Sequence, residues 1–388
     1  MNKIQKDELL NLDTPENEER RKFFELSGKY GLATAAVVAS AGALLSSEAT
    51  AQTVKEEKER KKAASHSLIM ATGYIAGASR WYPTMQLDFK ENIQNMTNGD
   101  VYVNLASGSK LGSGGKLAKK AQSGVIQIGI HAMANLAPFA PDIDLINIPY
   151  WAAENQKFVN LITSPIWNSV VIPKVEAKGF KILVNISTSS RTFTVRKGFD
   201  AITDPSQMRG VKFRVPGSKL LRQFYRLLGA NPTPIAWGET PSAIKQGVAD
   251  ALDPTINGLV NSGFADIVSN ITMAQSVHGG QVYSANLAWF QSLPKKIQEQ
   301  IEFAGENTFR QNLAKLPSSY AYSTSLMRRA GVKIHELNKG QVAAFAELGG
   351  HQRKEWDPVK IKLAGSLSNF EKMFEAANTQ GKYVVHNV

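Results

Sequence analysis

The chain has 388 residues, a length typical of two or three domains, and its 43 % hydrophobic and 20 % charged residues are ordinary for a folded globular protein. It contains no cysteine, which excludes disulfides, thiolate metal sites, iron–sulfur clusters and cysteine nucleophiles. The formal net charge is +12, from 45 Lys and Arg against 33 Asp and Glu. This excess either serves solubility or indicates an anionic partner: nucleic acid, membrane headgroups or a small anion.

The first 51 residues have the pattern of a secretory leader. Arg20-Arg21-Lys22 precede an uncharged, Ala-rich stretch at residues 31–47, and Ala49-Thr50-Ala51 puts small residues at positions −3 and −1 of a cleavage site. The stretch is too short and too rich in Ala and Gly for a good transmembrane span. The paired arginines followed by Phe23 resemble a twin-arginine signal, which the folded-protein export machinery recognises. An ordinary secretory signal and an uncleaved anchor are the alternatives.

The basic character belongs to the chain beyond this leader. Residues 1–51 hold six basic and eight acidic residues, so the remaining chain carries 39 basic and 25 acidic residues and a net charge of +14. Residues 55–62 have no apolar side chain. We therefore expect a solvated, charged linker over residues 52–64, between the cleavage site and the fold.

Beyond residue 64, short apolar runs alternate with helical patterns, which predicts an α/β architecture with largely parallel sheets. The runs predict strands at residues 67–71, 101–105, 126–130, 181–186 and 211–215. Within the last strand, Lys212 and Arg214 face away from its apolar positions.

Several helix signals can be placed in the same way. A stripe of apolar residues from Trp81 to Met96 predicts one amphipathic helix. Ser218 is the expected cap of a second helix, and Thr240-Pro241 of a third. A long helical region follows Pro294 and extends past residue 325, with an interruption expected near Pro317.

Most catalytic motifs are absent from the sequence. The six histidines include no pair at i, i+4, and no serine has glycines at both −2 and +2. The cluster Gly112-Ser113-Gly114-Gly115-Lys116 fails as a phosphate loop because Lys110 and Leu117 occupy required positions. We expect it to form a glycine-rich turn into a helix. The dispersed basic residues argue against nucleic acid, so we expect no metal, no cofactor and no nucleic-acid partner.

The second half carries a family resemblance in its motifs. These are Gly210-Val-Lys-Phe-Arg214-Val-Pro216, Leu228-Gly-Ala-Asn-Pro-Thr-Pro234, Trp237-Gly-Glu239 and Ala243-Ile-Lys-Gln-Gly-Val-Ala-Asp250. In this order and spacing they resemble the DctP-like solute-binding proteins of TRAP (tripartite ATP-independent periplasmic) transporters. The similarity covers nearly all of residues 65–340.

The resemblance implies a periplasmic-binding-protein-like fold: two α/β domains with a ligand cleft, crossing hinge segments and a long connecting helix. It implies a domain I of residues 65–188 plus 277–318. Domain II would be residues 189–276, joined by residues 319–388 with the C-terminal helices.

The resemblance also implies ligand-binding residues. Arg214 matches the family arginine that pairs with a ligand carboxylate, Arg191 matches a second arginine found in many members, and Trp237 occupies a position that is often aromatic. A guanidinium can bind a carboxylate through two hydrogen bonds, which lysine cannot do. We expect Arg214 to await its ligand without holding the core together. A structural ion pair, and core packing for Trp237, are the alternatives.

One motif departs from the family pattern. Asp253 and Pro254 stand where the family has Glu and Asn, so an amide that often contacts ligand is missing, and Asn257 is a candidate replacement. From domain I, the candidates are Tyr74, Arg80, Trp81 and His131. For Asn257 and these four, a structural or surface role is the alternative.

These features favour a periplasmic solute-binding protein, not an enzyme, that captures a small organic carboxylate and delivers it to TRAP permease subunits. An exported two-domain enzyme acting on an organic acid, or a ligand-binding subunit for a sensor, are the alternatives.

The leader yields a first prediction. Replacing Arg20 and Arg21 together by Lys should trap the precursor in the cytoplasm, because the export machinery reads the arginine pair and not its charge. Fractionation followed by immunoblotting checks this. An unchanged periplasmic yield would show that the general secretion route is used.

Overall fold

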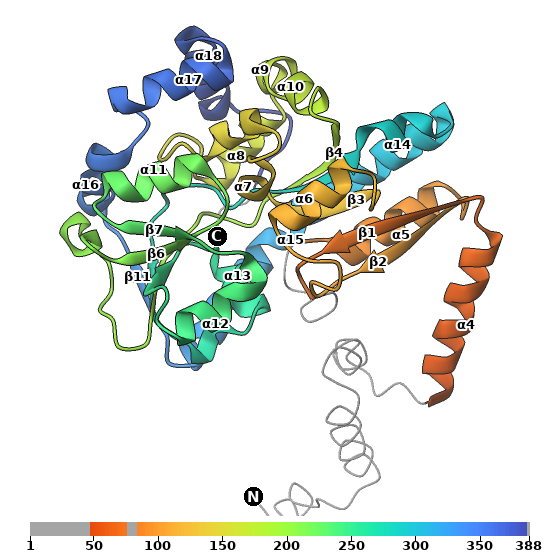
Figure 1. Ribbon diagram of the computed structural model, residues 1–388, viewed down its shortest axis with the longest axis horizontal. Helices are drawn as coiled ribbons and strands as arrows, with labels where there is room; N and C mark the ends of the chain where they lie inside the picture. Colours follow the sequence, from red (N-terminus) through yellow and green to blue (C-terminus); the bar gives the residue numbers. More distant parts are fainter. Residues whose placement is uncertain (1–46, 76–83, 386–388) are drawn as a thin grey trace, which may run out of the picture.

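Two β-sheets, each flanked by helices, organise the chain into two lobes (Figure 1). The structure is a computed structural model that describes residues 47–75 and 84–385. Arg80 and Trp81 lie outside these residues. The fold is α/β, as the sequence predicts.

The first sheet has five strands in the order β2-β1-β3-β10-β4. The strands are β1 (His66–Thr72), β2 (Val101–Ala106), β3 (Ile128–Ala132), β4 (Phe180–Ile186) and β10 (Gln281–Asn286). The three central apolar residues of β1 are almost fully buried or packed on the core, as expected for a strand covered on both faces. Four of these strands match predicted runs, and β3 begins two residues later than predicted.

The second sheet has six strands in the order β11-β9-β5-β8-β6-β7. The strands are β5 (Phe193–Arg196), β6 (Lys212–Val215), β7 (Asn231–Pro234), β8 (Ala251–Leu252), β9 (Val268–Met273) and β11 (Lys333–Glu336). Both sheets are mixed, which corrects the expectation of largely parallel sheets. β10 pairs antiparallel with β3 and β4, and β5 with β8 and β9. The reason is topological: β5 and β10 are the strands that the chain enters from the other lobe.

Two crossing segments, residues 187–192 and 274–280, join the lobes side by side. The Arg191 amide donates to the Val277 carbonyl at 2.8 Å, and the Gly279 amide donates to the Ser189 carbonyl at 2.9 Å. Asn312 clamps the start of the first segment, accepting from the Ser187 amide at 2.9 Å and donating to the Ser187 carbonyl at 3.0 Å. The crossing is therefore a short hydrogen-bonded ribbon tied to a helix.

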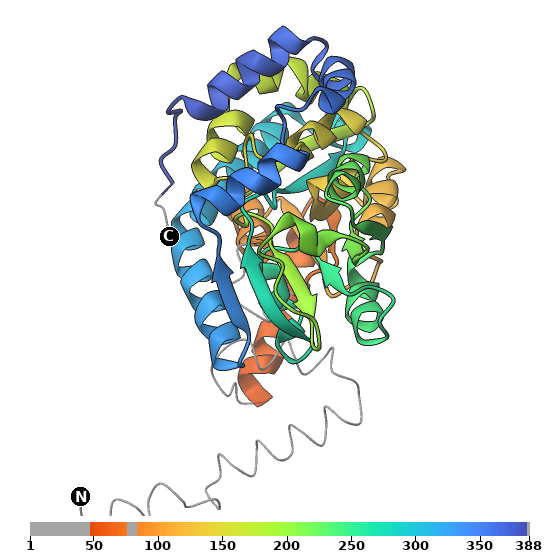
Figure 2. The ribbon, with the colours of Figure 1, turned by 90° about the vertical axis from the view of Figure 1, so that its left-hand side faces the viewer.

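That helix is α15 (Lys295–Arg329), which has 35 residues and runs past both lobes. It packs on α5 and β4 of the first lobe and on α13 and β11 of the second, and Figure 2 shows it lying beside β11. The expected interruption near Pro317 is wrong, because α15 continues through this residue. A proline removes one helical hydrogen bond, and the buried side chains Leu313 and Leu316 pack the same stretch against the core.

The remaining helices cover the sheets and the outer surface. In the first lobe they are α5 (Gln86–Met96), α6 (Gly115–Gln122), α7 (Met133–Leu136), α8 (Asn155–Ile162), α9 (Pro165–Val170), α10 (Ile172–Glu176) and α14 (Leu287–Ser292). In the second they are α11 (Lys219–Leu227), α12 (Thr240–Lys245) and α13 (Ile256–Asn261). The 3₁₀ segments are η2 (Pro141–Asn147), η3 (Pro205–Met208), η4 (Trp237–Glu239), η5 (Phe264–Asp266) and η6 (Lys354–Trp356).

The predicted helix starts hold in part. Ser218 caps α11 by accepting from the Leu221 amide at 3.0 Å. Thr240, by contrast, is the first residue of α12 and not its cap, because η4 runs directly into the helix. α5 begins only at Gln86, after Met85 in a left-handed conformation with φ 57°.

The C-terminal helices are α16 (Lys339–Gly349), α17 (Asp357–Ala364) and α18 (Leu367–Asn378). α16 packs on α11, whereas α17 packs on η2 and α18 on α8 and α9. The two sheets draw their strands from residues 66–186 with 281–286 and from residues 193–273 with 333–336. The domain borders given above stay predictions.

Most of the charged segment expected as a linker over residues 52–64 lies in a helix, α4 (Ser47–Ala63). Alternating Lys, Arg and Glu are good helix formers, so the absence of apolar residues does not prevent a helix. Within residues 47–75 and 84–385, no helix combines the length and apolar character needed to cross a bilayer.

The contact between α15 and β4 supplies a second prediction. A Cβ at Gly305 would lie 2.3 Å from the Leu183 carbonyl oxygen, so Gly305→Ala must push α15 off the sheet. We expect the free energy of unfolding to fall by roughly 1–3 kcal/mol, although Gly to Ala in an open helix stabilises by about 1 kcal/mol. Urea denaturation measures this, and a more stable variant would contradict the packing described.

Candidate ligand-binding site

A cavity of about 50 Å³ lies between the lobes and takes its walls from both. Tyr74, Ala132 and Asn135 come from the first lobe, and Thr188, Arg191, Gly279 and Gln281 from the crossing segments and the start of β10. Arg214, Pro216, Trp237, Pro254, Thr255 and Gly258 come from the second lobe. Among these described lining residues, two are arginines and none is acidic.

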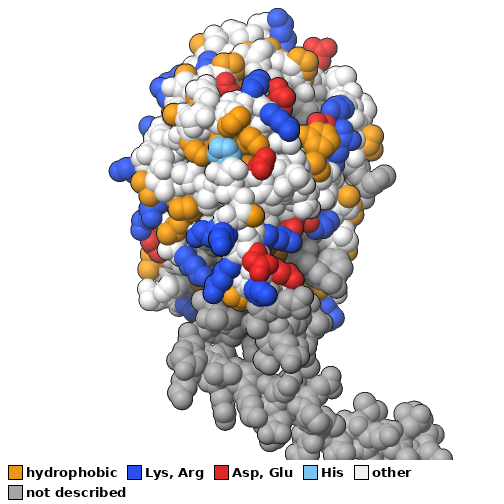
Figure 3. Space-filling view, turned by 90° about the vertical axis from the view of Figure 1, so that its right-hand side faces the viewer, with side chains coloured by type: hydrophobic (Ala, Val, Ile, Leu, Met, Phe, Trp, Pro, Cys, Tyr) orange, Lys and Arg blue, Asp and Glu red, His pale blue; other side chains and the backbone are white. Residues whose placement is uncertain are grey.

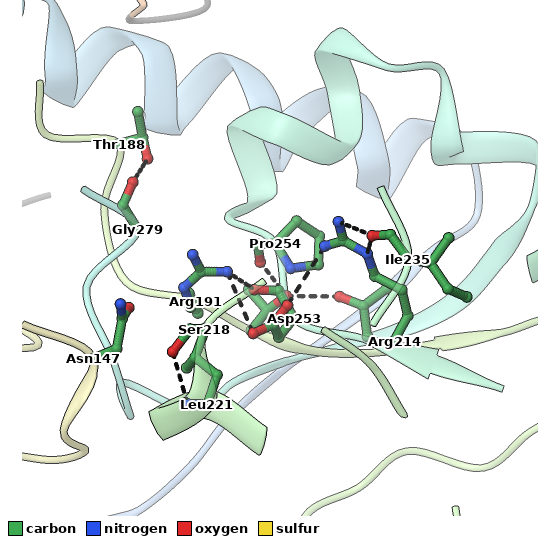
Figure 4. A network of polar contacts seen from close by, with 12 residues as sticks. Asn147, Thr188, Arg191, Arg214, Ser218, Leu221, Ile235, Asp253, Pro254 and Gly279 are labelled. Atoms are coloured by element: carbon green, nitrogen blue, oxygen red, sulfur yellow. Dashed lines mark hydrogen bonds and ion pairs between the residues drawn. The ribbon is translucent and has the colours of Figure 1, made fainter. Parts of the chain in front are cut away.

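The arginines reach the cavity from different elements. Arg214 lies on β6, on the strand face opposite Phe213, and Arg191 lies on the first crossing segment. Asp253 follows the short strand β8, which pairs with both β5 and β6 and so brings this carboxylate between the two arginines. Figure 4 shows the two guanidinium groups approaching Asp253 from opposite sides.

Arg191, Asp253 and Arg214 form a triad in which the contacts of Asp253 with Arg191 are shorter than those with Arg214. Arg191 Nη1 lies 3.3 Å from Asp253 Oδ2 and donates to the Asp253 backbone carbonyl at 3.1 Å. Arg214 Nη1 lies 3.8 Å from Asp253 Oδ1. All three residues are buried, with exposed fractions of 5 % for Arg191, 3 % for Arg214 and 0 % for Asp253. Two positive charges and one negative charge are thus withdrawn from water together.

Burial perturbs the protonation of this group. Burial lowers the pKa of Arg214 to about 10, and the Asp253 charge opposes that shift. Burial raises the pKa of Asp253, while Arg191, Arg214 and the Tyr225 hydroxyl oppose the rise. Arg214 therefore stays charged at neutral pH, and two guanidinium groups within 4 Å favour the carboxylate form of Asp253.

Part of the Arg214 guanidinium is hydrogen-bonded to the protein itself. Its Nε and Nη2 both donate to the Ile235 carbonyl, at 3.0 and 2.7 Å. One edge of the guanidinium is therefore occupied, and Nη1 faces Asp253. A ligand can meet only the remaining donors of this side chain together with those of Arg191.

Trp237 and Tyr74 form part of the cavity wall. The Arg214 guanidinium lies 5.2 Å from the Trp237 ring, and the indole Nε1 donates to the Ser262 hydroxyl at 3.0 Å. Trp237 also packs on Phe264 with ring centroids 5.4 Å apart. The indole is thus oriented as a flat wall beside the arginine.

Two other predicted residues lie away from the cavity lining. Asn257 is 1 % exposed in α13, and its side-chain amide forms no hydrogen bond among the described residues. The neighbouring Gly258 lines the cavity instead. His131 faces Ser284 on the adjacent strand, 3.0 Å from its hydroxyl, and burial lowers its pKa to about 4.

Sequence reasoning missed several lining residues. Asn135 follows the carboxyl end of β3, where ligands of open α/β sheets bind, and that rule could have found it. Thr188, Gly279 and Gln281 belong to or adjoin the crossing segments. No local pattern marks them, because only the return of the chain brings them together. Thr255 caps α13 and lines the cavity at the same time.

The glycine-rich turn lies where the lobes meet beside the cavity. It leads into α6 through Gly114, as predicted, with the left-handed φ values that glycine permits (54° at Gly114 and 103° at Gly112). A Cβ at Gly238 of the second lobe would come within 3.4 Å of the Ser113 hydroxyl. Lys116 also lies 4.0 Å from Glu239 across the gap. The two lobes are therefore in contact at this edge.

Within the described residues, no group of three or more His, Asp or Glu is arranged to hold a metal ion.

A site between two hinged α/β lobes, lined by arginines, is typical of a solute-binding protein. Residues 73–356 match the family described as bacterial extracellular solute-binding protein, family 7, and the chain belongs to this family.

Relatives and solved structures agree with this assignment. The C4-dicarboxylate-binding periplasmic protein DctP of Rhodobacter capsulatus is 24 % identical over 67 % of this chain and 78 % of its own. A TRAP periplasmic solute-binding protein of Roseobacter denitrificans with bound β-D-glucuronate has a TM-score of 0.71 and 18 % identity, over 81 % of this chain and all of its own. Another from Desulfovibrio salexigens, with bound orotic acid, has a TM-score of 0.72 and 19 % identity, over 80 % of this chain and 98 % of its own.

The triad yields a third prediction. Asp253→Asn leaves two buried guanidinium groups without a counter-charge, so the free energy of unfolding should fall by about 3–5 kcal/mol. Urea denaturation of the ligand-free protein measures this.

Asp250→Asn is the matched control. Asp250 pairs with Arg196 at 3.1 Å and Lys212 at 3.7 Å, whose side chains are 32 % and 49 % exposed. Water screens these partners, so we expect a loss of about 1 kcal/mol or less. Equal, small losses of unfolding free energy in both variants would mean that the triad does not stabilise the cavity floor, which is the part formed by Arg191, Asp253 and Arg214.

Proposed function

We propose that this protein captures a small organic acid in the cavity between its lobes, in the periplasm, and delivers it to the permease subunits of a TRAP transporter. The observation that carries the proposal is the charge balance of the cavity floor. Two buried arginines face one buried carboxylate, and the other described lining residues add no negative charge.

A ligand carboxylate would balance this charge. Burying an ion is costly unless a counter-ion and hydrogen bonds replace its water. The Arg191 Nε is buried and finds no hydrogen-bond partner among the described residues, and Arg214 lines the same cavity. A carboxylate placed against the two guanidinium groups would accept charge-assisted hydrogen bonds from those of their N–H groups that form no hydrogen bond within the protein.

The ligands of related proteins support this chemistry. Glucuronate, orotate and C4-dicarboxylates, named for three of them, all carry a carboxylate. The indole of Trp237 and the ring of Tyr74 provide flat walls that suit a sugar ring or an aromatic ring. We therefore propose that the ligand is a single-ring sugar acid or aromatic acid, or a short hydroxy acid. The protein would bind and release this ligand without catalysing a reaction.

The remaining parts of the proposal concern export and partners. The leader pattern supports export through the twin-arginine machinery, and the relatives' names describe those proteins as periplasmic. Delivery to a permease is favoured over a sensor partner because the related structures are named as TRAP proteins.

A thermal-shift screen tests the ligand class. The exported protein is heated with D-glucuronate, D-galactonate, orotate and succinate, with glucose and ethanolamine as uncharged and cationic comparisons. A ligand at 100 times its Kd stabilises the folded state by roughly 2.7 kcal/mol, which raises the melting temperature measurably. A shift with glucose or ethanolamine and with none of the acids would refute the carboxylate proposal.

A fourth prediction concerns the arginines. Arg214→Ala should weaken binding of an acid found in the screen by about 30- to 4000-fold, since loss of one partner of a buried charge pair costs roughly 2–5 kcal/mol. Arg191→Ala should weaken it similarly. Arg214→Lys keeps the charge opposite Asp253 and should recover only part of the affinity. Calorimetric titration measures all three.

Arg196→Lys is the control, because Arg196 is ion-paired in the same sheet but does not line the cavity. Melting curves without ligand separate folding from binding, since Arg214 also bonds Ile235. A folded Arg214→Ala protein that binds as tightly as wild type would make this residue purely structural.

A further inference from the structure

The helix α4 has no part in the cavity and lies outside the matched family region, which begins at residue 73. It extends from the first lobe on the side away from the second (Figure 1). Its described residues 53–63 include only Val54 and Ala63 as apolar residues, and Val54 is 50 % exposed. Hydrophobic burial therefore does not explain why α4 is kept against the lobe.

Polar contacts hold one face of α4 in place. Glu57 accepts from Lys90 Nζ at 2.7 Å and from the Tyr102 hydroxyl at 3.0 Å. Arg60 Nη1 lies 3.5 Å from Glu91 Oε1 on α5. The ion pair with Lys90 and the Tyr102 hydrogen bond lower the pKa of Glu57 against its burial, so the contact persists at neutral pH. A groove beside this contact is lined among others by Arg60, Gln94 and Tyr102.

The opposite face of α4 is a lysine stripe formed by Lys55, Lys58 and Lys62, with Lys61 beside it. Positions 55, 58 and 62 follow i, i+3, i+7 spacing and share one side of a helix, and Glu57 and Arg60 point to the other side. All four lysines are exposed. Lys55 pairs with Glu59 at 3.9 Å, whereas Lys58, Lys61 and Lys62 form no ion pair among the described residues. Figure 3, which faces this side of the molecule, shows the basic side chains gathered there with a few acidic ones.

We propose that the lysine stripe of α4 is a contact surface for an anionic lipid bilayer. The charge is complementary, and the docked face fixes the direction in which the stripe points. Residues 53–63 carry five basic and three acidic side chains, so this segment is net positive. A basic surface that projects from the lobe is attracted to anionic lipid headgroups.

Such a contact would keep the first lobe near the bilayer and leave the cavity free, since no α4 residue lines it. It would raise the local concentration of the protein at the membrane without a tight complex. The attraction is electrostatic and should weaken as salt shortens the screening length from about 10 Å at 0.1 M.

Vesicle co-sedimentation of the exported protein, without any organic acid, tests the proposal. The vesicles contain phosphatidylcholine alone or with 30 mol % phosphatidylglycerol, at low and high NaCl. Replacing Lys55, Lys58, Lys61 and Lys62 together by Gln should weaken binding to the anionic vesicles about tenfold or more. Binding to phosphatidylcholine alone should be negligible for both proteins.

The charge-matched control replaces Lys219, Lys245, Lys295 and Lys296 by Gln; these lysines are exposed, lie on other helices and lose the same net charge. We expect the control to weaken binding less than threefold. Equal losses in the two variants would overturn the proposal, because the basic character of the whole protein would then explain binding. So would undiminished binding of the α4 variant, or displacement by inorganic phosphate well beyond that by NaCl at equal ionic strength, which indicates a phosphate site and not a lipid surface.

Discussion

Asp253 is buried between Arg191 and Arg214, and these three residues set the charge at one side of the cavity. A single carboxylate cannot balance two guanidinium groups, and the low polarity of the surroundings makes the difference matter. The triad depends on the short strand β8, whose pairing with β5 and β6 sets Asp253 between an arginine of the sheet and an arginine of the crossing segment. The second sheet therefore positions the charge that the proposed function needs.

The crossing segments carry the charge of Arg191 and also connect the two lobes, so they link the charge at the cavity to the relative movement of the lobes. Arg191 lies on a ribbon of two hydrogen-bonded segments that Asn312 ties to α15, and α15 contacts both lobes. Closure of two lobes about such segments is the usual response of periplasmic binding proteins to a ligand. At the far edge of the cleft, Gly238 approaches Ser113, and Lys116 faces Glu239. The Lys116–Glu239 pair is exposed and therefore weak, which suits lobes that must part again to release a ligand.

The sequence predicted the fold class, the positions of five of the eleven described strands, the long helix and the cap at Ser218 because these depend on local periodicity and local hydrogen bonds. It missed the mixed sheets and the continuity of α15 through Pro317, because both depend on where distant segments return. The cavity follows the same division. Arg191, Arg214 and Trp237 could be proposed from motifs, whereas Thr188, Asn135 and Gln281 become neighbours only through the crossing. The binding roles of all of these residues stay predictions.

The occupied edge of Arg214 is the most instructive difference. A motif identifies an arginine, but it cannot show that the Ile235 carbonyl uses two of its donors. The strand pairing of β6 with β7 leads directly to that carbonyl, so only the sheet register reveals it. The consequence is that the two arginines act as a pair, each with some donors spent on the protein.

The central claim is that the cavity binds its ligand because the ligand carries a negative charge. The most direct measurement is calorimetric titration of the wild-type protein at pH 7 with an acid that stabilises it, compared with the primary amide of the same molecule, such as glucuronate against glucuronamide. The amide has nearly the same shape but no charge. The account predicts that the amide binds at least about 30-fold more weakly, the lower end expected for losing one partner of a buried charge pair. Equal affinities for the acid and the amide would contradict it.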